Sequence, residues 1–582
     1  MNMKEERNSS IEELALKHAL LNAFRHGGKA QTEAVIKKLL AERPELRRNV
    51  KEIIPIVNII VKQVNQKTLS EIKETIAQKW PEELETKKEQ ERARELPPLP
   101  YAKEGRVVTR FAPNPDFVLH LGSARPAILS YVYAKKYRGR FILRFEDTDP
   151  KTKPPILEAY ESIREDLRWL NISWDAEYIQ SQRMEIYYQH AQELIRKGYA
   201  YICTHTQEEI RQMRREGLVD PCSNYPPQIH LEKWENMIKG EYGEGEAVLR
   251  IKTDPKHPDP SVRDWIAFRI IDTEKHPHPL VGSKYVAWPT YNFACTIDDH
   301  LLGVTHILRA KEHQTNTVKQ SFIYKYFGWK EPVAIHFGRV GLEGTILSKS
   351  KIKAGIERGL YEGWDDPRLG TLRALRRRGI LPQAIWDLIL EIGVKPSSAR
   401  ISIENLHSIN RKYLEHIANR YMFVPEPVEI KLKWHDDALK ARIPYHPSYP
   451  ERGHRTIVLS KTGGSFKVFV PRRDIDRMLR ERETRLLGLA TIKPLKFPEF
   501  EVIDVSHEVK KGQFVVQWVP VDENVKVKVI KAEKSDIVEI LGLGEKSLKK
   551  LNVDARVQFF RFGFVRLDSE GDEGYVFYYT HS

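Results

Sequence analysis

Residues 106–149 read RVVTRFAPNPDFVLHLGSARPAILSYVYAKKYRGRFILRFEDTD, and this stretch decides the fold. A β-rich run at 107–111 leads into a loop with several prolines, and residues 124–137 have the composition and length of a helix. A second β-rich run follows at 141–145 and ends in a cluster of acidic residues. Strand, loop, helix and strand in this order predict a parallel crossover, with Pro126 in the first turn of its helix.

Length and composition limit the possible classes of protein. A chain of 582 residues is too long for one ordinary core, so it predicts several domains. The formal net charge of +15 leaves two interpretations, a polyanionic partner or a merely solvated basic surface. The 3 cysteines exclude a disulfide framework. Because there is also no membrane-length apolar run and no signal peptide, we expect a cytoplasmic protein that needs no membrane.

The pattern of helical and β-rich runs predicts a multidomain α/β fold. Its segments are a helical N-terminal module with a linker (1–100), two halves of a parallel-sheet catalytic domain (101–200 and 286–352) around an insertion (201–285), a helical connector (353–422) and β-barrels (423–582). The N-terminal module shows no recognisable chemistry. An appendage that docks or contacts RNA and a plain structural extension therefore remain as alternatives.

The predicted insertion contains a set of residues that can bind a metal. Cys203, His205 and Cys222 offer three soft ligands, and His230 is one choice for a fourth. Their spacing lacks the tight cysteine pairs of structural zinc sites. We therefore expect free cysteines beside a surface histidine, with zinc as the less favoured alternative.

Two later stretches place charged residues beside apolar runs. Residues 288–313 read WPTYNFACTIDDHLLGVTHILRAKEH, which indicates a pocket or, alternatively, a strand whose charged end meets solvent. Residues 337–352 read FGRVGLEGTILSKSKI, a permissive cationic loop that can close on phosphate. Alone, its Ser-Lys-Ser triplet is more often a plain surface loop.

Read together, these motifs resemble a known family. HLGS at 120–123, after a strand, and LSKSK at 347–351 resemble the two signature motifs of class I aminoacyl-tRNA synthetases. RFAPNPD at 110–116, FILRFEDTDP at 141–150 and DDHLLGVTHILRAKEH at 298–313 are similar to glutamyl-tRNA synthetases, over nearly the whole chain. The β-rich end points to the archaeal and eukaryotic type. The resemblance implies a Rossmann-type catalytic domain, an insertion that binds the tRNA acceptor end, and barrels that bind the anticodon.

The resemblance also implies an activity. It is that of a glutamate–tRNA ligase that uses ATP and Mg2+ to form glutamyl-adenylate and then charges tRNA(Glu). Whether tRNA(Gln) is also charged stays open. The alternatives are a glutaminyl-tRNA synthetase and a non-catalytic tRNA-binding homologue, and the expected state is a monomer.

Residue by residue, the matching motifs give an implied site. The implied catalytic residues are His120, Gly122, Ser123 and Lys349. The implied ATP-binding residues are Pro113, Asn114, His120, Gly122, Ser348, Lys349 and Ser350, and the implied glutamate-binding residues are Arg110, Glu146, Tyr291 and Arg309. Glutamate and glutamine differ chiefly in charge, so selecting glutamate requires a cation. Arg309 is the main reason to expect glutamate, because glutaminyl relatives lack arginine at the matching position.

The chain departs from the family pattern at three positions. Ser123 replaces the final histidine of the first motif, and Asn114 stands where many relatives have serine. Cys295 occupies a position that is asparagine in bacterial members. Because a thiol cannot make the hydrogen bonds of an amide, we do not assign that binding role to Cys295.

Overall fold

The computed structural model describes residues 3–25, 29–43, 45–46, 50–80, 96–343, 345–346, 348–506, 512–533 and 536–582. The chain forms two compact units, Met1–Pro97 and Pro98–Ser582. The charged part of the predicted linker, residues 82–95, lies outside the described residues. No helix among the described residues is both long enough and apolar enough to cross a membrane.

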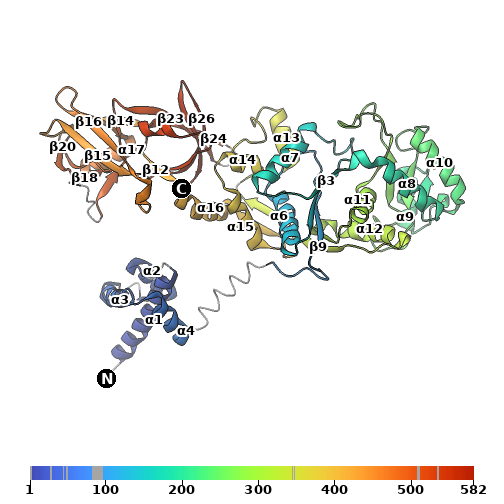
Figure 1. Ribbon diagram of the computed structural model, residues 1–582, viewed down its shortest axis with the longest axis horizontal. Coiled ribbons are helices and arrows are strands. Elements are labelled where there is room, and N and C mark those ends of the chain that lie inside the picture. Colours follow the sequence, from blue (N-terminus) through green and yellow to red (C-terminus); the bar gives the residue numbers. More distant parts are fainter. Residues whose placement is uncertain are drawn as a thin grey trace. The chain divides into compact units, whose positions relative to one another are not determined.

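The N-terminal unit is helical, as predicted. Its helices are α1 (Met3–Arg25), α2 (Thr32–Glu42), α3 (Val50–Val64) and α4 (Leu69–Lys79) (Figure 1). Their apolar faces meet in one core, in which Leu39 and Val57 are fully buried. A capping box starts α4, because Thr68 accepts from the backbone N–H of Glu71 and Glu71 accepts from that of Thr68.

The second unit is built on a parallel sheet from two distant parts of the chain. One part is β1 (Val108–Phe111), β2 (Arg140–Phe145) and β3 (Ala176–Ile179), and the other is β8 (His306–Ala310) and β9 (Val333–Phe337). The parts join where the backbone N–H of Thr305 donates to the carbonyl of Val108 at 2.9 Å. This bond sets the start of β8 beside the start of β1, so the three-stranded sheet of β1, β2 and β3 is continued by the two-stranded sheet of β8 and β9, with the carboxyl ends at one edge.

Helices lie between the strands of this sheet in the chain. They are α6 (Leu121–Lys136), α7 (Leu157–Trp169), α8 (Met184–Arg196), α11 (Tyr291–Leu301) and α12 (Gln314–Phe327). Our prediction that Pro126 lies in the first turn of its helix is wrong. A capping box at His120 and Ser123 starts α6 at Leu121, which places Pro126 inside the helix. The stretch 288–313 contains both a helix and a strand, since α11 occupies its centre and β8 follows.

The predicted insertion forms an antiparallel sheet with its own core. Its elements are β4 (Ala200–Cys203), α9 (Gln207–Glu216), the 3-10 helix η3 (Pro221–Asn224), α10 (Pro227–Lys239), β5 (Val248–Ile251), β6 (Ile266–Ile270) and β7 (Ala287–Pro289). Neighbouring strands run antiparallel in the order β4-β5-β6-β7. Trp234, Phe268 and Trp288 are buried in the core between this sheet and the helices.

The connector and the C-terminal region follow. The connector contains β10 (Val340–Glu343), α13 (Lys349–Glu357), α14 (Leu372–Arg377), α15 (Pro382–Ile392), β11 (Ala399–Ser402) and α16 (Ile403–Ile417). One C-terminal group of elements is β14 (Pro427–Lys433), β15 (Ala438–Pro444), β16 (His454–Ser460), β17 (Phe466–Pro471), α17 (Arg472–Arg480), β18 (Thr484–Leu486), β19 (Ala490–Pro494), β20 (Glu499–Asp504), β21 (Phe514–Val516) and β22 (Val519–Pro520). The other is β12 (Asn419–Tyr421), β13 (Phe423–Pro425), β23 (Asn524–Glu533), β24 (Asp536–Glu545), β25 (Arg556–Phe559), β26 (Gly563–Gly571) and β27 (Gly574–His581).

These strands form two sheets of seven and a separate antiparallel pair, β15 with β16. Each sheet of seven has its own hydrophobic core, so the β-rich C-terminal region and the multidomain α/β class are confirmed. Residues 560–562 form the turn between β25 and β26. At this turn Phe559 and Phe562 both contact Phe423.

Candidate active site

A cavity of about 450 Å³ opens at the carboxyl ends of β1, β2 and β8, beside the start of α6. At this edge of an open parallel sheet the connecting loops diverge, which makes room for ligands. Six of the predicted site residues line it: Arg110, His120, Gly122, Glu146, Tyr291 and Arg309. The structure thus brings together residues from both halves of the sheet, while the roles assigned to them stay predictions.

The start of α6 presents a neutral histidine to the cavity. Burial lowers the pKa of His120, and its Nδ1 accepts from the backbone N–H of Ser123 at 3.3 Å. The remaining proton therefore lies on Nε2, which can donate to an anion. Ser123 completes the cap, because its Oγ accepts from the backbone N–H of His120 at 3.0 Å. A Cβ on Gly122 would lie 2.8 Å from Cε1 of His120, so glycine at this position leaves room for the histidine ring.

Four charged side chains form a buried charge network beside the cavity: Arg110, Arg144, Glu146 and Asp299. Oδ1 of Asp299 accepts from Nε of Arg110 at 3.2 Å and from Nη1 of Arg144 at 2.7 Å. Nη2 of Arg144 donates to Oε1 of Glu146 at 2.8 Å. Burial alone raises the pKa of Asp299, but the two arginines lower it to about 2. Burial also raises the pKa of Glu146, although Arg144 and Arg110 oppose this shift.

Arg309 has a different environment, because its partners are all neutral. Its guanidinium donates to Tyr291 Oη at 3.2 Å, to Thr317 Oγ1 at 2.6 Å and to Gln320 Oε1 at 2.9 Å. Arg309 is only 5% exposed, and its Nε has no hydrogen-bond partner within the described part of the chain. Burial and the charge of Arg309 lower the pKa of the neighbouring His313 to about 4. A buried cation without a carboxylate partner is suited to binding an anionic ligand.

The remaining predicted ATP-binding residues lie near the cavity but do not line it. Lys349 starts α13 and forms an ion pair with Asp116, which lies in the loop between β1 and α6. Hydroxyls of Ser348 and Ser350 are 3.3 Å apart. In the same loop as Asp116, the carbonyl of Pro113 accepts from the backbone N–H of Glu146 at 3.0 Å.

Asn114, also in that loop, has a buried Oδ1 without a partner in the described part of the chain. Residue 347 of the second motif and residue 344 just before the motif lie outside the described residues.

The metal candidates of the insertion do converge, with one correction. His230 does not join them, because its Nδ1 accepts from the backbone N–H of Ile202 at 3.2 Å. Asp220 takes its place: the ligand atoms of Cys203, His205, Asp220 and Cys222 all lie within 4.8 Å of one another. Burial raises the pKa of Cys203 to about 12, so its thiol is protonated unless a cation binds.

Sequence reasoning missed three residues of these sites. Asp299 of α11 and Arg144 of β2 form an ion pair that connects these two elements. Asp220, which caps the start of η3, lies with the two cysteines of the insertion. An acidic pair at residues 298–299 in an otherwise apolar helix was the available signal for Asp299. A carboxylate ligand such as Asp220 cannot be recognised from the spacing of cysteines and histidines.

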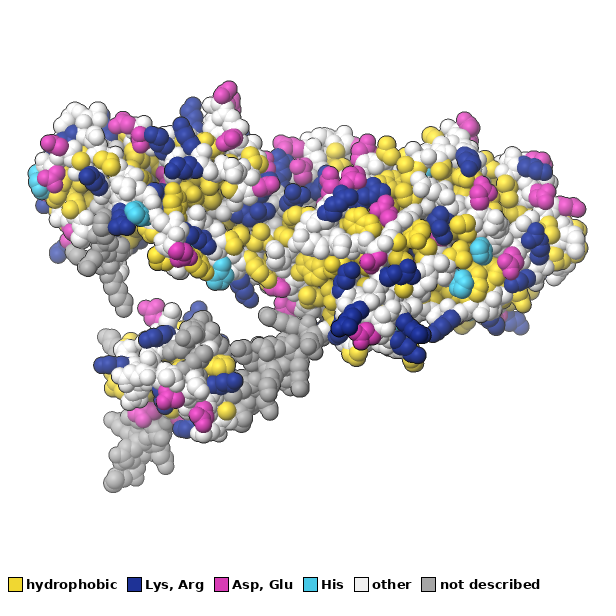
Figure 2. All heavy atoms as spheres, in the orientation of Figure 1, with side chains coloured by type: hydrophobic (Ala, Val, Ile, Leu, Met, Phe, Trp, Pro, Cys, Tyr) yellow, Lys and Arg dark blue, Asp and Glu magenta, His cyan; other side chains and the backbone are white. Residues whose placement is uncertain are grey.

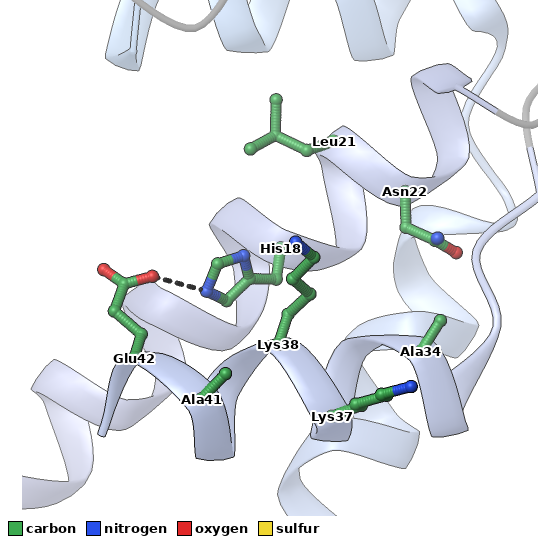
Figure 3. Close-up of a pocket in the computed structure, with 8 residues that line it drawn as sticks. All are labelled: His18, Leu21, Asn22, Ala34, Lys37, Lys38, Ala41 and Glu42. Atoms are coloured by element: carbon green, nitrogen blue, oxygen red, sulfur yellow. Dashed lines mark ion pairs between the residues drawn. The ribbon is translucent and has the colours of Figure 1, made fainter. Parts of the chain in front are cut away.

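A second hollow lies in the N-terminal unit. It measures about 640 Å³ and lies between α1, which contributes His18, Leu21 and Asn22, and α2 (Figure 3). Nε2 of His18 pairs with a carboxylate oxygen of Glu42 at 2.8 Å. None of the predicted site residues contributes to its lining, so it is separate from the candidate active site.

Basic side chains are spread over the visible surface of the second unit. In Figure 2 lysines and arginines are interspersed with acidic side chains on this face. Some arginines are also paired with acidic side chains, as Arg373 is with Glu165 and Arg377 is with Asp568. The positive net charge of the chain is therefore not concentrated in a single basic patch on this face.

Comparisons with known proteins agree with one family. A model described as "tRNA synthetases class I (E and Q), catalytic domain" matches residues 106–416, and models described as anti-codon binding domains of this class match 418–510 and 515–568. The glutamate–tRNA ligase of Thermofilum pendens is 55% identical, covering 98% of this chain and 99% of that protein. That of Pyrobaculum calidifontis is 52% identical, covering 98% and 100%. A solved glutamate tRNA ligase from Elizabethkingia meningosepticum is 23% identical over 54% of this chain and 70% of that chain, with a TM-score of 0.40.

Proposed function

The chain belongs to the class I tRNA synthetases of the glutamate and glutamine type, and on this premise we propose that it joins L-glutamate to tRNA(Glu) at the expense of ATP. The predicted resemblance and ligase activity are confirmed by the full-length relatives, which are glutamate–tRNA ligases. Within the site, the observation that carries the choice of glutamate is the buried Arg309, whose partners are all neutral. We further propose that the protein acts as a cytoplasmic monomer.

The proposed first step forms glutamyl-adenylate. An α-carboxylate oxygen of glutamate attacks the α-phosphorus of MgATP, the new acyl–phosphate bond forms, and the bond to pyrophosphate breaks. The Nε2–H of His120 donates to a phosphate oxygen at the start of α6, where the helix dipole favours an anion. Lys349 supplies a further positive charge as negative charge builds up in the transition state.

The proposed second step transfers the glutamyl group. A terminal hydroxyl of the tRNA attacks the acyl carbon, and AMP leaves with the phosphate. Throughout both steps, Arg309 binds the side-chain carboxylate and Glu146 accepts from the α-amino group. Tyr291 supports Arg309, because its hydroxyl accepts from the guanidinium at 3.2 Å.

The amino-acid specificity gives a direct test. With purified tRNA(Glu) and ATP, we expect kcat/KM for glutamate to exceed that for glutamine by at least about 10–100-fold, because one charge-assisted hydrogen bond contributes about 1.5–3 kcal/mol. Charging is measured for both amino acids under one condition, with tRNA(Gln) tested in parallel. Charging with glutamine alone would contradict the assignment, and no charging with either amino acid would favour a non-catalytic homologue.

A second proposal concerns the cluster of Cys203, His205, Asp220 and Cys222, which we assign as a zinc site. Tetrahedral zinc with bonds of about 2.0–2.3 Å separates its ligand atoms by roughly 3.3–3.8 Å. Nδ1 of His205 lies 3.8 Å from Sγ of Cys203 and 3.5 Å from Sγ of Cys222. Oδ1 of Asp220 is 2.9 Å from the same nitrogen, a hydrogen-bond distance that has to widen by about 0.4 Å for both atoms to bind zinc. Bound zinc would tie β4 to η3.

Metal analysis tests this site. We expect about one zinc per chain in the dialysed protein, and Cys222→Ser is expected to reduce this to below about 0.1, because structural sites need all their ligands. Cys295→Ser is the matched control, since Cys295 is equally buried but lies outside the cluster. If the wild-type chain binds no zinc even after incubation with excess metal, the cysteines are free thiols.

A further inference from the structure

Asp299 is the most constrained charged group that the proposed reaction leaves without a role. Its side chain is 1% exposed and does not line the cavity, so it cannot contact the amino acid directly. It connects the three elements that build the pocket, because it lies on α11 and accepts from Arg110 of β1 and Arg144 of β2. Any effect of Asp299 on the reaction must therefore pass through these arginines.

Through Arg144, Asp299 controls the state of Glu146. Nη1 of Arg144 is engaged by Asp299 at 2.7 Å, which leaves Nη2 to donate to Oε1 of Glu146 at 2.8 Å. Oε2 of Glu146 has no partner within the described part of the chain, and Glu146 lines the cavity. One carboxylate oxygen is thereby kept available for an ammonium group.

Through Arg110, Asp299 controls the charge of the cavity. The buried charge network holds two guanidinium groups and two carboxylates, so it is neutral as a whole. Arg309 then remains as the uncompensated cation of the glutamate-binding set. Without Asp299, Arg110 would become a second uncompensated cation. Both Nη groups of Arg144 could then donate to Glu146. The glutamate-binding set would change from one uncompensated cation and one open acid to two uncompensated cations and a masked acid.

We propose that Asp299 is a positioning residue that makes the site select an α-amino acid over a plain dicarboxylate. The inference rests on the proposed glutamate-charging activity and deepens it. Glutarate is the discriminating probe, because it is glutamate without the amino group. It keeps the carboxylate that Arg309 attracts and lacks the ammonium that Glu146 accepts, so the preference for glutamate over glutarate reports directly on Glu146.

The test compares KM for glutamate with the inhibition constant of glutarate in aminoacylation. We expect glutarate to bind about 10–100-fold more weakly than glutamate in the unmodified chain, the value of one charge-assisted contact. The measured ratio is the inhibition constant of glutarate divided by KM for glutamate. In D299N this ratio falls to below about 3, and in D299E it stays above about 10, because the longer acid retains the charge. A D299N variant that loses activity with an unchanged ratio would mean that Asp299 is merely structural.

Asp298 supplies a matched control on the same helix. It is fully buried and accepts from Gln180 Nε2 at 3.1 Å, Arg183 Nε at 2.9 Å and Tyr187 Oη at 2.7 Å, all in the described part of the chain. These partners do not include Arg110 or Arg144, although the charge of Asp298 also raises the pKa of Arg144. D298N is expected to lower stability while the ratio stays within about twofold of the unmodified chain. A fall in D298N equal to that in D299N would assign the effect to lost packing and overturn the proposal.

A double variant keeps the question answerable if D299N does not fold. D299N/R144Q removes one acid and one base, so the network stays neutral, and Arg144, the guanidinium that donates to Glu146, is gone. We expect its ratio to return above about 10, the value of one charge-assisted contact. A ratio near 1 in this variant would overturn the proposal. Absence of glutamate charging by the unmodified chain would instead contradict the proposed function, so the two failures are distinguishable.

Discussion

The Arg309→Gln variant is expected to lose at least about 30-fold in kcat/KM for glutamate, because truncating one partner of a buried, hydrogen-bonded charge pair costs about 2–5 kcal/mol. Glutamine carries no side-chain charge, so its use is expected to change much less. The ratio of the two kcat/KM values therefore narrows in this variant. It is measured by charging purified tRNA(Glu) with each amino acid at saturating ATP.

Arg339→Gln is the matched control for this prediction. Arg339 lines the same cavity, but its side chain is 73% exposed and pairs with Glu312. Exposed ion pairs contribute about 0–1 kcal/mol, so we expect a change of less than about fivefold in kcat/KM. If Arg309→Gln leaves the preference for glutamate intact, the side-chain carboxylate is bound elsewhere in the cavity, with Arg110 as the next candidate.

Local sequence was sufficient to predict much of the catalytic fold, because the signals that start and end its elements are short-range. The runs at 107–111 and 141–145 became β1 and β2, and the helix between them differs mainly in its first turn. That error has a physical cause. Histidine is an unusual N-cap residue, so the start of α6 at Leu121 depends on the reciprocal bonds between His120 and Ser123 rather than on a common capping pattern.

The site was less predictable from local patterns, because its decisive contacts join distant segments. Arg110 and Asp299 are 189 positions apart, and their ion pair depends on how α11 lies against the sheet. The resemblance to a known family identified residues that would touch a substrate, but it gave no information on which of them the protein already neutralises. The structure separates Arg110, which has a carboxylate partner, from Arg309, which has neutral partners.

Lys349 raises a different question, since its partner in this structure is a carboxylate of the protein. It forms an ion pair with Asp116 and is 39% exposed. The lysine end of this pair is exposed although Asp116 is only 11% exposed, so the triphosphate of ATP, with its several negative charges, can reach Lys349 and displace Asp116. If so, the contact between Lys349 and phosphate is made only after ATP binds, and it can strengthen further as charge builds up in the transition state.

Replacing Lys349 with alanine is therefore expected to lower kcat for aminoacylation by about 10²–10³, the usual effect of removing one group that stabilises transition-state charge. The KM for tRNA is expected to change by less than about threefold, because a single lysine contributes little to the binding free energy of a large RNA interface. Lys351→Ala is the control, since Lys351 is exposed on the same helix. Asp116→Asn tests the exchange of partners: it should lower KM for ATP without lowering kcat. An equal loss in both lysine variants would mean that the loop contributes only general positive charge, and that Lys349 has no special position in the reaction.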